Sequence, residues 1–274
     1  METKVAIVTG SNRGLGFEIV KGLCLKFKGV VYLTARNEER GQQAVQKLEE
    51  QGLHPLFHVL DVTSEESVQQ FSNYLSIHHT GIDVLVNNAG VIDFDKSVST
   101  YEESKKLIDT NFNSLLTISK HLYPLLRNDA RVINISSDWG LLSNIRKQFW
   151  LDTLAKDNLK VEEILQFVND FLQAAKSGKT SFLAFAGHFG DYKVSKVAMS
   201  ALTFVQQRQF QEQGKDVSIN CVHPGFIKTD MTKGMGDMTP ERGAHAPLYL
   251  ALDAPQSLKG CFLWHDCHQV NWDD

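Results

Sequence analysis

A tyrosine–lysine pair is the most direct indication of chemistry in this chain of 274 residues. Tyr192 and Lys196 lie four positions apart at the start of an expected helix over 192–212, so they share one helical face. A tyrosine hydroxyl has an unperturbed pKa of about 10 and is a weak acid–base catalyst at neutral pH. A nearby ammonium group favours the phenolate, so we expect Lys196 to lower the pKa of Tyr192. Tyr192 could then give its proton to an alkoxide formed by reduction of a carbonyl group.

Polar side chains also follow two expected strands. Ser137 comes just after the apolar run 131–135, where it could donate to a substrate oxygen or simply cap the next helix. Asn88, Ala89 and Gly90 follow the run 83–86 and belong to the same edge of the expected sheet. Asn111 lies inside the next expected helix, where asparagine is a mediocre helix former, and this favours a polar role.

The first expected strand, over 4–8, leads into a glycine turn that opens a helix. Its residues are Gly10, Asn12, Arg13, Gly14, Leu15 and Gly16. Glycines in such a turn let the backbone approach a pyrophosphate, and the helix N-terminus supplies N–H donors. The G-x3-G-x-G spacing differs from G-x-G-x-x-G, and a purely structural turn is the alternative. The position of the turn favours a dinucleotide site.

Basic residues after the second expected strand, over 30–34, favour NADPH over NADH. NAD sites usually carry an acid there to hold the ribose 2′-hydroxyl, but Ala35, Arg36 and Asn37 follow this strand. We expect Arg36, Arg40 and Arg13 to converge on a 2′-phosphate, although solvated surface arginines are the alternative.

One further pair is expected at the adenine end of the dinucleotide. Asp61 and Val62 follow the third expected strand and are placed to meet the adenine. An aspartate that caps the next helix is the alternative.

Strands alternate with helices along the whole chain. This pattern predicts a Rossmann-type, doubly wound α/β fold with seven parallel strands and helices on both faces. We expect one domain over 1–274, with a helical insertion over about 141–189 before the Tyr192 helix. Within it, apolar residues from Ile164 to Ala175 follow a helical period. That stripe is a core face, a lid or a partner surface.

Composition narrows the functional classes. The formal net charge of −4 gives no footprint for nucleic acid or an anionic membrane surface. Apolar runs are too short to span a bilayer and no signal peptide is visible, so a cytoplasmic protein is expected. The spacing of Cys261, His265, Cys267 and His268 fits no standard zinc pattern, so no metal is expected.

These motifs occur in the order found in the short-chain dehydrogenase/reductase family, which the chain resembles over essentially its whole length. It is most similar there to monomeric NADPH-dependent carbonyl reductases, in its 33–36, 83–90 and 224–231 segments and its long insertion. The resemblance implies a small-molecule carbonyl substrate and a monomer, because the insertion is placed to cover the family's usual oligomer surface.

The resemblance also implies site roles. Tyr192 is the acid–base group, Lys196 holds the nicotinamide ribose and tunes Tyr192, Ser137 orients the carbonyl and Asn111 anchors a relay water. The resemblance further implies that the loop after the sixth expected strand contacts the nicotinamide. The residues implied there are Pro224, Gly225, Ile227 and Thr229. Trp139, Phe226 and His223 depart from similar enzymes and are expected to line the substrate pocket.

Three alternatives remain at this point. A sugar-nucleotide epimerase uses a similar pair of residues, but little sequence follows Lys196 here to form its substrate domain. An NAD-dependent alcohol dehydrogenase conflicts with Arg36 and Arg40. A non-catalytic NADP(H)-binding sensor is disfavoured by the complete set of catalytic residue types.

Overall fold

The computed structural model describes residues 2–96, 99–178 and 188–273 and is organised around one sheet. The spatial order is β3-β2-β1-β4-β5-β6-β7-β8. The strands are β1 (Lys4–Val8), β2 (Gly29–Ala35), β3 (Leu56–Val59), β4 (Ile82–Asn87), β5 (Leu126–Ile135), β6 (Ser218–Val222), β7 (Phe262–Leu263) and β8 (Gln269–Val270). Seven strands pair in parallel, as predicted. The eighth, β8, pairs antiparallel with β7 and was not predicted, because two residues carry no readable period.

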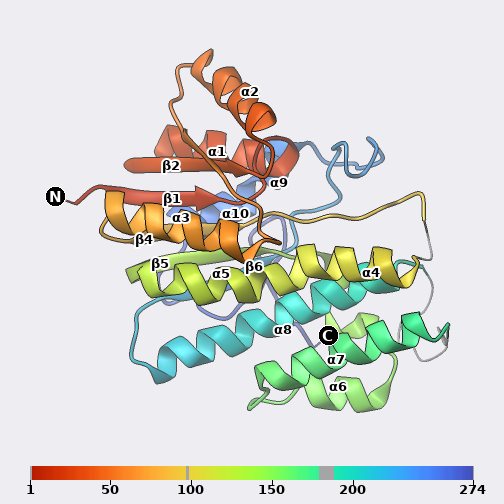
Figure 1. Ribbon diagram of the computed structural model, residues 1–274. Coiled ribbons are helices and arrows are strands. Elements are labelled where there is room, and N and C mark those ends of the chain that lie inside the picture. The colour runs from red at the N-terminus through yellow and green to blue at the C-terminus, as the bar shows by residue number, and fades with distance from the viewer. Residues whose placement is uncertain (1, 97–98, 179–187, 274) are drawn as a thin grey trace.

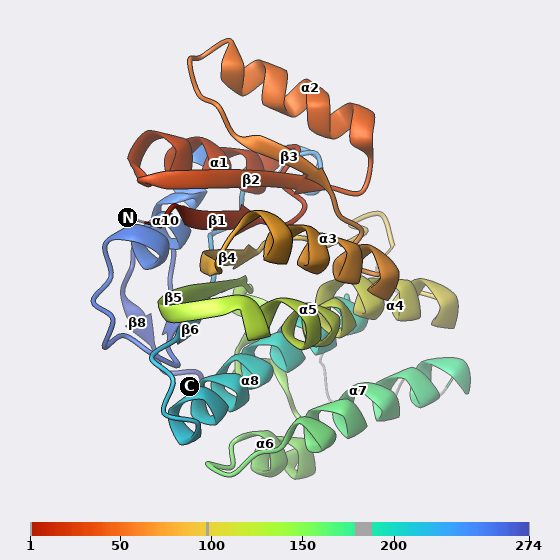
Figure 2. The same cartoon turned by 60° about the vertical axis from the view of Figure 1, so that its left-hand side comes forward.

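Helices cover both faces of this sheet (Figures 1 and 2). They are α1 (Gly14–Lys26), α2 (Glu38–Glu49), α3 (Glu65–His78), α4 (Tyr101–Ile108), α5 (Ser114–Leu122), α6 (Gln148–Leu154), α7 (Val161–Lys176), α8 (Gly190–Glu212), α9 (Pro240–Gly243) and α10 (His245–Leu252). None of the helices in the described ranges is long and apolar enough to cross a membrane.

Strand β1 shows how the sheet separates two apolar cores. Val5 and Ile7 pack with α3 and α5, whereas Ala6 and Val8 pack with α1, α2 and α10. All four side chains are fully buried. Alternate residues of a strand point to opposite faces, so a continuous apolar run is what a strand covered on both sides requires.

The single long helix expected over 102–126 was wrong. The segment consists of α4, a π-helical turn η1 (Asp109–Asn113), α5 and a 3₁₀ turn η2 (Tyr123–Leu125). Pro124, in the last turn, has no N–H to donate, and β5 follows it at once, five residues earlier than predicted. The π-helical turn holds Asn111, whose side chain bonds to other segments.

The insertion before the Tyr192 helix contributes α6 and α7. The apolar face of α7 packs on α4 and α8, which lie beside it in Figures 1 and 2. Its buried residues are Ile164, Phe167, Val168, Phe171 and Ala174. This confirms the interpretation of the stripe as a core face. The part of the expected insertion over 179–187 lies outside the described residues, and the single-domain organisation stays a prediction.

Candidate active site

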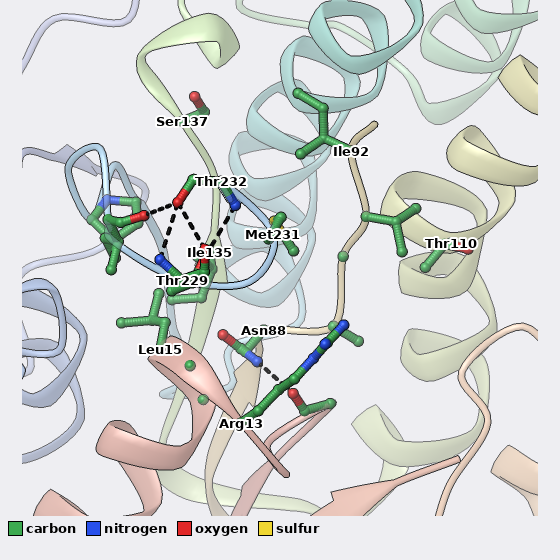
Figure 3. Close-up of a pocket in the computed structure, with 18 of the residues that line it drawn as sticks. Arg13, Leu15, Asn88, Ile92, Thr110, Ile135, Ser137, Thr229, Met231 and Thr232 are labelled. Atoms are coloured by element: carbon green, nitrogen blue, oxygen red, sulfur yellow. Dashed lines mark hydrogen bonds between the residues drawn. The ribbon is translucent and has the colours of Figure 1, made fainter. Parts of the chain in front are cut away.

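A cavity of about 820 Å³ lies at the carboxyl ends of the parallel strands. It spans the point where β1 has β2 on one side and β4 on the other, which is where ligands bind in doubly wound sheets. Ser137 lies at one end of it, and Arg13 and Leu15 lie at the other (Figure 3). The expected dinucleotide and carbonyl sites are therefore two ends of one cavity.

The glycine turn packs tightly against the loop after β4. Gly10 has a φ of 60°, and a Cβ there would lie 2.9 Å from the Cα of Ala89. A Cβ on Gly16 would lie 2.4 Å from the Asn88 amide nitrogen. That amide donates to the main-chain oxygens of Thr9, at 2.9 Å, and Gly10, at 3.0 Å. Asn88 therefore holds the turn in shape, and larger residues at Gly10 or Gly16 would displace it.

The N-terminus of α1 has the features of an anion site. Gly14 has a φ of 58°, and a Cβ there would come within 3.3 Å of the Thr229 side chain. No side chain caps the helix at Arg13, and its first turn contains no acidic residue. The first N–H groups and the positive end of the dipole thus remain available to a phosphate. The cradle fits a dinucleotide pyrophosphate.

Two of the three arginines expected to converge on a 2′-phosphate line the cavity. Arg36 lines the cavity after β2, and no acid stands beside it. Arg13 also lines the cavity, where its guanidinium forms an exposed ion pair with Asp230 at 3.1 Å. Arg40 is exposed on α2 and is not among the lining residues, because the N-cap at Asn37 places it a turn into the helix. Arg36 is therefore the best-placed partner for a 2′-phosphate.

Asp61 and Val62 line the same end of the cavity as Arg36. The Asp61 carboxylate accepts hydrogen bonds from the main-chain N–H and the hydroxyl of Thr63, at 2.9 and 2.7 Å. Asp61 thus shapes the turn before α3, and the N-cap of that helix is Ser64. The structure places both residues where the adenine was expected.

Helix α8 brings Tyr192 and Lys196 to the opposite end. Both residues line the cavity, and the Lys196 ammonium lies 5.5 Å from the centre of the Tyr192 ring. The ammonium donates to the main-chain oxygen of Ile135, the last residue of β5, at 2.6 Å. This bond ties α8 to the sheet edge from which Ser137 extends.

Burial dominates the pKa values of this pair. It raises the pKa of Tyr192, the charge of Asp138 adds to the rise, and the Ser137 hydroxyl partly offsets it. Burial also lowers the pKa of Lys196 to about 7. The expectation that Lys196 lowers the pKa of Tyr192 therefore does not describe this cavity. Tyr192 remains protonated at neutral pH, as a proton donor must be.

Ser137 caps a turn and lines the cavity, and its donation to a substrate oxygen stays a prediction. Its hydroxyl oxygen accepts from the Trp139 N–H at 3.2 Å, which caps the turn η3 (Asp138–Gly140). The same hydroxyl lines the cavity and donates to the Asp138 carboxylate at 2.7 Å. The far end of the chain supports this turn, because the Trp272 indole donates to the Gly140 oxygen at 2.6 Å.

Asn111 lies behind the cavity wall and is fully buried. Its side chain accepts from the Val91 N–H at 2.8 Å and donates to the Val91 oxygen at 2.9 Å and to Ser195 at 3.2 Å. Gly90 does line the cavity, and a Cβ there would lie 3.4 Å from the Asn111 side-chain oxygen. Asn111 thus joins the loop after β4 to α8 beside Lys196, and its relay water stays a prediction.

The loop after β6 closes the remaining side. Its cavity-lining members include all five residues expected there: Pro224, Gly225, Phe226, Ile227 and Thr229. Gly225 has a φ of 90°, and a Cβ there would lie 2.8 Å from the Met238 sulfur. The close approach of this loop to Met238 therefore depends on glycine at position 225.

Sequence reasoning missed part of the substrate end. Phe94 and Phe189 pack against the expected residues. Phe189 stacks on Trp139 with ring centres 5.5 Å apart, and Phe94 meets Phe226 edge-on at 6.1 Å. Asp138 also lines the cavity. Phe94 and Asp138 follow expected strands, a signal that could have been used. Phe189 has a φ of 63°, and such a backbone conformation in an aromatic residue is visible only in the structure.

Known proteins resemble this chain in sequence and in fold. The model of the family described as short chain dehydrogenase matches residues 4–149. The mouse protein named carbonyl reductase (NADPH) 1 is 36% identical over 258 residues, which cover 92% of each chain. Its human counterpart is 34% identical over 265 residues, again 92% of each chain.

Two solved plant structures share the fold. Salutaridine reductase from Papaver somniferum superposes with a TM-score of 0.86 and 30% identity, over 96% of this chain and all of the other. Menthone neomenthol reductase from Mentha piperita gives a TM-score of 0.82 and 27% identity, over 96% of this chain and 99% of the other. This chain belongs to the short chain dehydrogenase family of oxidoreductases.

Proposed function

We propose that this protein is an NADPH-dependent carbonyl reductase that converts ketones, aldehydes or quinones to alcohols. The observation that carries the proposal is the meeting of Tyr192, Lys196 and Ser137 with the glycine turn in one cavity. The similarity to proteins named NADPH carbonyl reductases supports the cofactor and the reaction.

NADPH bound here would supply a hydride to the carbonyl carbon. The protein must meet the negative charge that grows on the carbonyl oxygen, and preorganised donors are most effective where such charge develops. In our proposal Tyr192 is the proton donor, because it lines the cavity beside Ser137 and Lys196. Lys196 is held in place by Ile135, from where its ammonium faces the Tyr192 ring.

The rest of the cavity has supporting roles in this proposal. The N-terminus of α1 binds the pyrophosphate, Arg36 the 2′-phosphate, and Asp61 and Val62 the adenine. Trp139 and Phe226 form part of the apolar wall against which the substrate packs. We also propose that the protein is a monomer, because the insertion helix α7 covers α4 and α8. A cytoplasmic location is part of the same proposal, and the similarity to the carbonyl reductases supports it.

The test is NADPH consumption by the purified protein with a panel of quinones, aromatic aldehydes, isatin-like diketones and steroid or terpenoid ketones. Activity with at least one class is expected. NADPH binding without consumption in the presence of any panel member would overturn the proposal in favour of a non-catalytic sensor.

A further inference from the structure

Asp138 places a carboxylate directly beside the groups that would reduce a carbonyl. It follows Ser137, lines the cavity, and has 47% of its side chain exposed. One carboxylate oxygen accepts the Ser137 hydroxyl proton at 2.7 Å. The other has no hydrogen-bond partner within the described part of the chain. The proposed function does not use this residue.

The carboxylate determines which way Ser137 can bond. A hydroxyl has one proton. The Ser137 hydroxyl donates to Asp138 in a charge-assisted bond and also interacts with Tyr192, whose pKa it lowers. The Ser137 oxygen also accepts from the Trp139 N–H. A carbonyl oxygen is itself an acceptor, so Ser137 can donate to it only by giving up Asp138. For a substrate with no other polar group, Asp138 therefore competes with the carbonyl oxygen for the Ser137 proton.

The negative charge of Asp138 also opposes the reduction of such a substrate. An alkoxide that develops at Tyr192 would be repelled by a carboxylate one residue beyond Ser137. His223 is the nearest potential counter-charge, but its Nδ1 accepts the Asp138 main-chain N–H at 2.9 Å, and burial lowers its pKa to about 4. The imidazole is therefore neutral at pH 7.

Lysine and arginine form no ion pair with Asp138 within the described part of the chain. The Lys193 ammonium interacts with the charges of Arg146 and Asp138 from a position 5.3 Å from the centre of a Trp139 ring. The second carboxylate oxygen is thus accessible to a donor group on a bound substrate.

We propose that Asp138 is a specificity-determining residue whose carboxylate binds a hydroxyl or ammonium group on the carbon next to the reacting carbonyl. The inference rests on the proposed function and names its substrate class, α-hydroxy and α-amino carbonyl compounds. When such a donor binds Asp138, it replaces the Ser137 proton there, and Ser137 is free to donate to the carbonyl oxygen. The substrate thus completes the site that reduces it.

The walls around Asp138 suit an aryl ketone as the probe. Trp139 meets the Tyr192 ring edge-on at 5.7 Å and stacks on Phe189 at 5.5 Å, and Phe94 continues this apolar surface. α-Hydroxyacetophenone and α-aminoacetophenone carry the two donors on the carbon next to the carbonyl. α-Methoxyacetophenone is the matched control, because it keeps the electron-withdrawing oxygen and lacks the hydroxyl proton.

The experiment compares kcat/KM for these ketones in the wild type, Asp138→Ala and Asp138→Asn. In the wild type, the hydroxy ketone is expected to exceed the methoxy ketone by at least about tenfold, as a hydrogen bond to a charged group allows. In Asp138→Ala, kcat/KM for the hydroxy ketone and for the amino ketone is expected to fall to that for the methoxy ketone. Asp138→Asn keeps an acceptor oxygen without the charge, so it should retain part of the hydroxyl preference and lose the ammonium preference.

NADPH binding, followed by the change in cofactor fluorescence, checks that each variant is folded. A hydroxy-to-methoxy ratio that is the same in the wild type and Asp138→Ala, in protein that reduces a quinone with NADPH, would overturn the inference and leave the proposed function standing. Failure of the wild type to reduce any carbonyl compound would overturn both.

Discussion

The ammonium of Lys196 donates to the main-chain oxygen of Ile135 at 2.6 Å, so helix α8 and strand β5 are joined at the end of the cavity that Tyr192 and Ser137 line. Ile135 is the last residue of β5, and Ser137 follows two positions later. One bond therefore sets the position of the lysine relative to the serine.

Replacement of Tyr192 by phenylalanine removes the proposed proton donor and keeps the ring. General acid catalysis typically contributes at least about 100-fold, so kcat for carbonyl reduction should fall by that factor while NADPH still binds. Tyr249→Phe, on α10, is the matched control and should keep kcat close to that of the wild type. A Tyr192→Phe protein that retains more than about a tenth of wild-type kcat would exclude this tyrosine as the donor.

Replacement of Arg36 by alanine should reduce the preference for NADPH. Loss of a charge-assisted bond to the 2′-phosphate is expected to lower kcat/KM for NADPH by about tenfold or more, with little effect on NADH. Arg40→Ala is the control, because Arg40 is exposed and does not line the cavity. Equal losses with both cofactors in Arg36→Ala, or equal efficiency of the two in the wild type, would refute the assignment.

NADPH affinity should depend on the ionisation of Lys196. Burial lowers the pKa of this ammonium to about 7, so its charge is present below that pH and is lost as the pH rises through about 7. The dissociation constant for the anionic cofactor, measured by fluorescence titration, should therefore increase over this range. Lys196→Met should bind more weakly with a flatter profile. The same slope in both proteins would show that another group titrates.

The protein should be a monomer at micromolar concentration. Helix α7 buries Phe167 and Phe171 against α4 and α8, so that surface is already occupied within the chain. Light scattering should give a mass near 30.8 kDa. A dimer or tetramer whose mass does not change on dilution would contradict this prediction.

Local sequence patterns were sufficient wherever neighbouring residues decide the outcome. The alternation of strand-like apolar runs with helical segments predicted the parallel sheet, and the i, i+4 spacing placed Tyr192 and Lys196 on one helical face. The helical period from Ile164 predicted the apolar face of α7. The pattern failed over 102–126, because the π-helical turn at Asn111 depends on bonds to Val91 and Ser195, which are distant in sequence.

The sequence by itself therefore determined the fold class, the position of the glycine turn and the residue types of the site. Only the tertiary structure decided the pKa values of these residues and which side chains lie next to them. Burial, which a sequence does not display, raises the pKa of Tyr192 and lowers that of Lys196, against the expectation from their spacing. Long-range packing likewise brings Phe189 beside Trp139, with their ring centres 5.5 Å apart. Desolvation and contact are properties of the assembled molecule, because each depends on segments that only folding brings together.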